Sequence, residues 1–110
     1  MSNLERISLL KSCCVEEPEN PFNFYALALE YREIDKMAAR QFFDRVSTDF
    51  PTYLPAYFPA AHFFFELNEL EKAKQLFETG IALATSLQEE KAKKELANAY
   101  QNFLFETDMD

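Results

Sequence analysis

The sequence predicts an all-α fold, and three observations carry that prediction. Glycine occurs once in 110 residues, although folds made of β-strands need frequent glycine-bearing turns. Apolar residues recur at spacings of three and four, the period of an amphipathic helix. Signatures of helix starts occur along the chain and leave only short connections. We therefore expect one domain of about six helices, in which sequential helices pack antiparallel.

The first two helices have clear starting signals. Ser2 and Glu5 have the spacing of a capping box, in which each side chain satisfies the other residue's free backbone N–H. This box predicts a helix over 3–15. Asn20 stands before a proline, and a proline in the first turn of a helix gives up no hydrogen bond. The second helix is therefore predicted over 21–33.

The third and fourth helices are also marked by their first residues. Asp35 can cap a helix over 36–49. Pro55 is another expected first-turn proline and predicts a fourth helix over 54–67. Pro59 lies inside that segment and removes one backbone donor, so we expect it to kink or loosen the first turns.

Two further helices, over 69–85 and 87–105, complete the chain. The fifth contains the only glycine, Gly80, which costs about 1 kcal/mol relative to alanine in mid-helix. Close contact with another helix is the expected compensation. Capping boxes are predicted at both starts, formed by Asn68 with Glu71 and by Ser86 with Glu89.

The second and third helices repeat as the fourth and fifth. Three positions of the second helix recur 33 residues later, and two positions of the third recur 34 residues later. A repeated helix pair of this period predicts a solenoid. The recurring pairs are Phe24 and Tyr57, Ala28 and Ala61, Tyr31 and Phe64, Ala39 and Ala73, and Phe43 and Phe77.

With these residues the chain resembles the tetratricopeptide repeat (TPR) family, in the form of a small bacterial-type TPR protein. The resemblance implies a helix-turn-helix solenoid of two full repeats in a single domain. Both repeats lack the turn glycine of the family, and Pro59 departs from its pattern. The expected parts of the domain 1–110 are a leading half-repeat helix (3–18), repeat 1 (21–51), repeat 2 (54–85) and a capping helix (87–105).

The resemblance also implies a concave groove, because one stripe of each repeat's first helix faces inward in the family. The residues expected to line it are Phe22, Tyr25, Leu29, Arg32, Phe58, His62 and Phe65. An apolar face of this kind must be covered. The candidate covers are a partner protein, a second copy of the chain, or the last helix through Leu96, Tyr100 and Phe103.

The expected function is non-catalytic protein–protein interaction. Some TPR proteins bind acidic tails through Lys, Arg and Asn in the groove, whereas this stripe is mostly aromatic. We therefore expect an apolar or amphipathic peptide or protein segment as the ligand. The alternative is a structural subunit that associates with itself as a homodimer, its groove filled by a second copy or by its own C-terminal helix.

Other functions are disfavoured by composition. The net charge of -8 argues against binding nucleic acid or an anionic membrane surface. The start of the chain lacks the basic residues of a signal peptide, so a cytoplasmic location is expected. His62 is the lone histidine, and Cys13 and Cys14 diverge on their helix, so we expect no metal. We also expect no cofactor and no catalytic residues, since no phosphate-binding glycine loop or nucleophile–base pair is visible.

Overall fold

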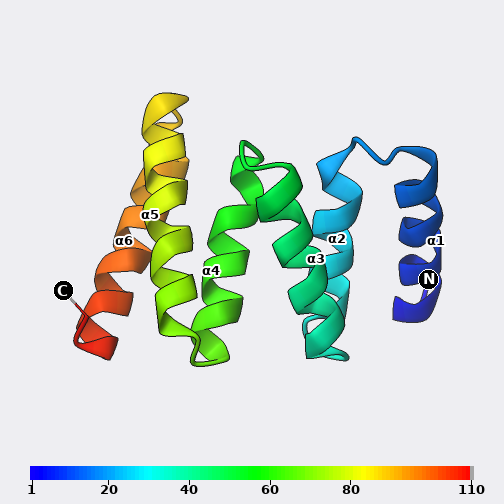
Figure 1. Ribbon diagram of the computed structural model, residues 1–110, viewed down its shortest axis with the longest axis horizontal. Coiled ribbons are helices and arrows are strands. Elements are labelled where there is room, and N and C mark those ends of the chain that lie inside the picture. The colour runs from blue at the N-terminus through cyan, green and yellow to red at the C-terminus, as the bar shows by residue number, and fades with distance from the viewer. Residues whose placement is uncertain (110) are drawn as a thin grey trace. The chain divides into compact units, whose positions relative to one another are not determined.

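The computed structural model describes residues 1–109, and the regular secondary structure of this part of the chain is all helical, with no β-strand (Figure 1). The helices are α1 (Asn3–Glu16), α2 (Pro21–Tyr31), α3 (Lys36–Asp49), α4 (Tyr57–Glu66), α5 (Leu70–Ser86) and α6 (Glu90–Thr107), with a 3-10 turn, η1 (Leu54–Ala56), ahead of α4. The all-α class and the six predicted helices are confirmed. None of the helices in this range is both long and apolar enough to span a membrane.

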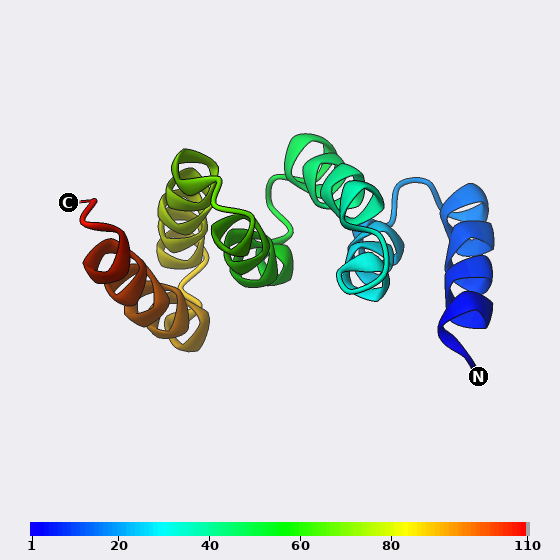
Figure 2. The ribbon, with the colours of Figure 1, turned by 90° about the horizontal axis from the view of Figure 1, so that it is seen from below.

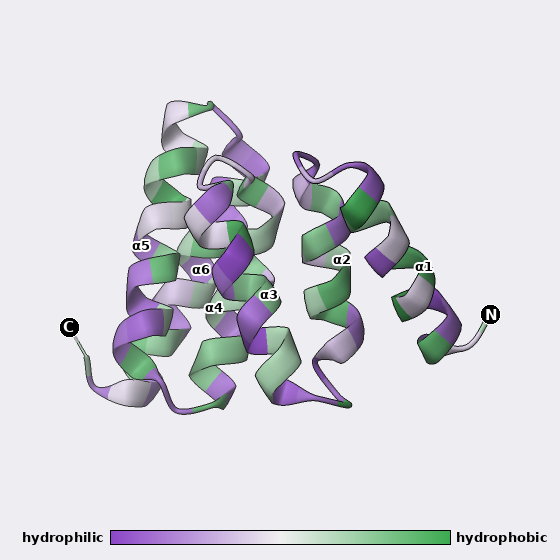
Figure 3. Cartoon of the chain, turned by 45° about the vertical axis from the view of Figure 1, so that its right-hand side comes forward, coloured by the Kyte–Doolittle hydropathy of each residue, from purple (hydrophilic) through white to green (hydrophobic). Residues whose placement is uncertain are grey.

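The helices belong to two compact units. Residues 1–56 form the first unit, with α1, α2, α3 and η1, and the second unit begins at Tyr57 and contains α4, α5 and α6. Every labelled helix carries both hydrophobic and hydrophilic residues (Figure 3). This mixture is typical of helices that bury one face and expose the other.

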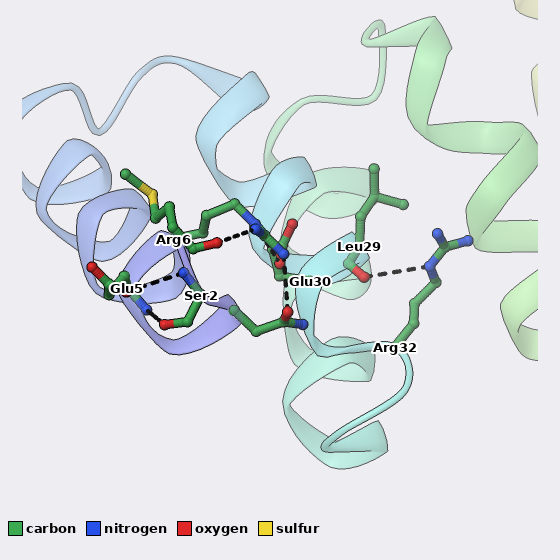
Figure 4. A network of polar contacts seen from close by, with 8 residues as sticks. Ser2, Glu5, Arg6, Leu29, Glu30 and Arg32 are labelled. Atoms are coloured by element: carbon green, nitrogen blue, oxygen red, sulfur yellow. Dashed lines mark hydrogen bonds and ion pairs between the residues drawn. The ribbon is translucent and has the colours of Figure 1, made fainter.

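In the first unit, α2 packs against both α1 and α3. Ala28 and Ala39 are fully buried, which lets α2 and α3 approach closely, and aromatic rings fill the space beside them. Phe24 stacks on Phe50 with ring centroids 6.0 Å apart. On the other side of α2, Arg6 of α1 donates from Nε to Glu30 Oε1 at 3.1 Å (Figure 4). This bond joins α1 to α2.

The starts of the first three helices are as the sequence predicts. Ser2 and Glu5 form the full capping box, with side-chain to backbone hydrogen bonds of 3.1 and 3.2 Å (Figure 4). The Asn20 side chain accepts from the N–H of Phe22, and the Asp35 side chain accepts from that of Ala38. Each cap satisfies a helix-terminal donor that would otherwise be unpaired.

The predicted capping boxes of α5 and α6 are wrong, because the residues involved end the preceding helices instead. Asn68 and Gln88 adopt left-handed backbones, with φ of 62° and 59°. After each helix the next N–H bonds back across the last turn, as in the Glu69 N–H bond to the Phe64 carbonyl at 2.9 Å. These are Schellman endings, which usually need glycine at the left-handed position. Asn68 takes that role between α4 and α5, which compensates for the missing turn glycine.

The predicted helix over 54–67 is divided into η1 and α4. Pro59 is the third residue of α4. It cannot donate to the carbonyl of residue 55, so the α-helical ladder begins only at Tyr57. The loosened first turns that Pro59 predicts are therefore a 3-10 turn.

In the second unit, α5 packs against both α4 and α6 (Figures 1 and 2). Gly80 of α5 is buried at the closest approach. A Cβ added there would lie 2.9 Å from the Cβ of Tyr57 on α4 and 3.2 Å from Cδ1 of Leu96 on α6. The expected reason for this mid-helix glycine is thereby confirmed: a side chain would push the neighbouring helices away.

Replacing Gly80 with alanine should destabilise the protein, although alanine is the better helix former. The helix-propensity gain of about 1 kcal/mol is outweighed by overpacking, which costs about 1–3 kcal/mol when the obstructing atom is a main-chain-linked Cβ. We expect a net loss of about 1 kcal/mol in the free energy of unfolding, measured by urea denaturation. Thr79→Ala, at an exposed neighbour, should change it by less than about 0.5 kcal/mol. Equal or higher stability of Gly80→Ala would contradict the close contact.

Candidate functional site

A pocket of about 480 Å³ lies between α4 and α6 in the second unit. Its lining is Phe58, His62 and Phe65 from α4, and Glu95, Asn98, Ala99, Asn102, Phe103 and Glu106 from α6. The side of the pocket formed by α4 is therefore aromatic. The side formed by α6 contains two apolar residues together with carboxylates and amides. All three residues that the sequence predicts for the groove in this repeat line the pocket.

The aromatic wall follows from the spacing of α4. Phe58, His62 and Phe65 are separated by four and three residues, so they share one face. The other face of α4, which carries Tyr57, Ala61 and other apolar residues, is buried against α5. Phe58 is 40% exposed at the edge of this apolar pocket.

His62 contributes an aromatic surface more than a polar one. Its ring lies 4.5 Å from that of Phe58 and 5.9 Å from that of Phe77, measured between centroids. Its Nε2 is buried without a hydrogen-bond partner among the described residues. Within residues 1–109, no three His, Cys, Asp or Glu side chains are grouped to hold a metal ion. The imidazole ring therefore packs against two phenyl rings, those of Phe58 and Phe77.

The last helix covers part of the aromatic face of α4. Phe103 is buried and places its ring 5.0 Å from Phe65 and 5.4 Å from Phe77. Leu96 is buried with it, beside Gly80. Phe103 thus packs against Phe65, while Phe58 stays 40% exposed and lines the open pocket.

A hydrogen bond holds α6 to α5 behind the pocket. Tyr100 donates from its hydroxyl to Glu78 Oε2 at 2.6 Å, and its ring stacks on Phe77. Burial of the phenol, together with the bond to the Glu78 carboxylate and the charge on that carboxylate, raises the pKa of Tyr100 to about 12.

Of the other four predicted groove residues, three lie on α2 in the first unit, and Arg32 is the residue directly after that helix. Phe22 is 52% exposed, and Arg32 is exposed with its Nε donating to the Leu29 carbonyl at 3.5 Å (Figure 4). Tyr25 is partly buried, with its ring 5.7 Å from that of Tyr53. Burial raises the pKa of Tyr25, and the Arg32 charge opposes that shift. These residues form an aromatic face on α2, and its union with the pocket in one groove remains a prediction.

Sequence reasoning missed the polar wall of the pocket. The sequence analysis considers the last helix only for its apolar residues Leu96, Tyr100 and Phe103. The signal was present in the spacing of α6, since residues three, seven and eleven positions after Glu95 share its face. They are Asn98, Asn102 and Glu106.

Comparisons with known proteins agree with this architecture. No family model and no curated protein matches the chain. Among solved structures, it is similar to a tetratricopeptide repeat domain protein from Salinibacter ruber, determined by solution NMR. The two are 28% identical with a TM-score of 0.72, and the match covers 78% of this chain and 88% of that one. The chain therefore has an all-α, TPR-like fold.

Stability should fall at alkaline pH partly because of Tyr100. Its pKa in the folded protein, about 12, exceeds the value of about 10 in an unfolded chain. The contribution is therefore complete below about pH 10 and is lost as the pH rises toward 12, because the unfolded chain releases its proton first. The free energy of unfolding, measured in urea from pH 8 to about pH 11.5, should decline more steeply for the unsubstituted protein than for Tyr100→Phe.

The unsubstituted protein and Tyr100→Phe should also differ in stability at neutral pH. Tyr100→Phe should be less stable by about 0.5–1.5 kcal/mol, because the bond to Glu78 is lost while the ring packing is kept. Subtracting the two pH curves removes the common effect of lysine titration. Parallel curves would show that the Tyr100 hydroxyl has no linkage to folding.

Proposed function

We propose that this chain is a member of the TPR family and a non-catalytic protein-interaction module. In this proposal, the pocket between α4 and α6 binds an apolar or amphipathic segment of a partner protein. The observation that carries the proposal is the open aromatic pocket itself, in which Phe58 remains 40% exposed although α6 covers the neighbouring Phe65. A large exposed aromatic side chain beside a concave apolar surface is typical of protein-binding sites.

The chemistry of the lining supports binding over catalysis. The pocket lining has no serine, threonine, cysteine or lysine, and its two carboxylates, Glu95 and Glu106, are exposed side chains that accept no hydrogen bond from a described residue to position them. The imidazole Nε2 of His62 is buried, so it is poorly placed to exchange protons with a bound substrate. The aromatic rings and the small Ala99 instead suit an apolar anchor of a partner.

The aromatic face of α2 is proposed as a further contact surface for a protein partner. Phe22, Tyr25, Leu29 and Arg32 share that face by spacing, and Phe22 is more than half exposed. We also propose a cytoplasmic site of action, supported by the two free thiols of Cys13 and Cys14.

Homodimer formation is the competing use of the pocket, and charge weighs against it. Each copy carries a net charge of -8, and the pocket wall supplied by α6 bears Glu95 and Glu106. Two copies meeting at this surface would bring like charges together, which opposes association. A different protein is therefore the favoured occupant.

A matched pair of phenylalanine substitutions tests the proposed function. A display library of random 12-residue peptides is selected on the full chain, and the enriched peptides are measured against Phe58→Glu and Phe105→Glu. Phe105 is 87% exposed on α6 and does not line the pocket, so it receives the same new charge at a control position. Phe58→Glu should weaken binding by about tenfold or more, as expected for an aromatic anchor site, and Phe105→Glu by less than about twofold.

Folding and association serve as controls for this test. Both variants should unfold within about 1 kcal/mol of the parent, because neither side chain is fully buried. Peptides that bind Phe58→Glu as tightly as the parent would contradict the proposal. A concentration-dependent dimer in sedimentation that only Phe58→Glu abolishes would instead support the homodimer.

A further inference from the structure

The pocket is electrically one-sided. Its lining contains two carboxylates, Glu95 and Glu106, and no lysine or arginine. Neither carboxylate takes part in a hydrogen bond or ion pair with any residue of the described part of the chain, and both side chains are exposed. An uncompensated negative potential beside an apolar surface favours a ligand that brings positive charge to it.

Glu106 lies on the C-terminal part of α6, which carries no lysine or arginine. The basic residues of α6 are Lys91, Lys93 and Lys94, and no lysine or arginine follows Glu95 in the chain. The C-terminal end of the helix, at Thr107, adds the partial negative charge of the helix dipole. Glu95, by contrast, has lysines within one turn that reduce its local potential.

Phe103 fixes the position of the apolar contact relative to this charge. It precedes Glu106 by three residues, so the two side chains are neighbours on one face of α6, about 5–6 Å apart at Cβ. Phe65 lies against the ring of Phe103, at a centroid distance of 5.0 Å. The apolar subsite and the negative end of the pocket are therefore adjacent.

We infer that the pocket selects a partner-protein segment in which an apolar side chain, seated on the accessible part of Phe65, is accompanied by a neighbouring Lys or Arg that meets Glu106. This inference rests on the proposed function and specifies the chemistry of its partner. Glu106 is the main specificity residue and Glu95 a weaker one. A second copy of this acidic chain does not fit the requirement, and neither does a nucleic acid.

The test uses the peptides selected on the full chain, with affinities measured by fluorescence anisotropy at about 50 mM salt, where the Debye length is above 10 Å. Selected sequences should be enriched in Lys or Arg next to Leu, Met or an aromatic residue. Glu106→Gln should weaken binding of the tightest peptide by about two- to fivefold, and Glu95→Gln by less. Replacing the peptide's Lys or Arg with Gln should remove the difference between the parent and Glu106→Gln.

A charge-matched control separates the site from the net charge. Glu71→Gln removes one negative charge from an exposed position of α5 that does not line the pocket, and it should leave affinity unchanged. Glu106→Gln should fold at least as well as the parent, since it removes a negative charge near a helix C-terminus. The effect of Glu106 should also shrink as the salt concentration rises to about 0.5 M.

The results of these measurements separate the basic preference at Glu106 from the proposed peptide-binding function. Peptides that are apolar without a basic preference, bound equally by the parent and Glu106→Gln but weakly by Phe58→Glu, would overturn the inference and leave the proposed function standing. Peptides that bind Phe58→Glu and the parent alike would overturn both. If Glu71→Gln weakens the binding of basic peptides as much as Glu106→Gln does, the basic preference is due to the net charge. That result would overturn the role of Glu106.

Discussion

The second unit depends on how closely its three helices meet at Gly80. A single methyl group at this position would come within 2.9 Å of the Tyr57 Cβ and 3.2 Å of Leu96. Because Tyr57 belongs to α4 and Leu96 to α6, one glycine sets the approach of both helices to α5. That approach commits one face of α4 to α5, and Phe58, His62 and Phe65 must then face elsewhere. It also carries Phe103 against Phe65, which closes one side of the pocket and leaves the other open.

The first unit uses small residues for close helix packing as well. Ala28 and Ala39 have no exposed surface, and the aromatic rings beside them stack in pairs, as Phe24 does with Phe50 and Tyr31 with Phe42. Small residues set the helix spacing, and large flat residues fill what remains. The recurrence of this combination in α4 and α5, with Ala61 and Ala73 again fully buried, explains why the sequence repeats although few identical residues do.

Most of the fold could be predicted from the sequence, because burial of one helix face imposes a period that is visible in the residues themselves. The helix caps were predictable where a short polar side chain accepts from a free backbone N–H, as at Ser2. The cap predicted at Asn68 was wrong. There the same residue type was needed for a left-handed helix ending, and spacing alone does not separate the two roles. The α4 wall of the pocket was predictable from its spacing. The Glu95 and Glu106 wall was missed although its residues share one face by spacing, because exposed acids on a terminal helix usually face only solvent.

The pocket thus follows from packing, and its proposed preference for a basic, apolar segment follows from where the acids lie on α6. The pocket depends on the helix contact at Gly80, and nuclear Overhauser effects in the full chain measure that contact directly. We expect strong cross peaks from the Gly80 Hα protons to the Tyr57 Hβ protons and to a methyl group of Leu96. The absence of these cross peaks, with Gly80 showing cross peaks only to protons of α5, would contradict the arrangement that forms the pocket.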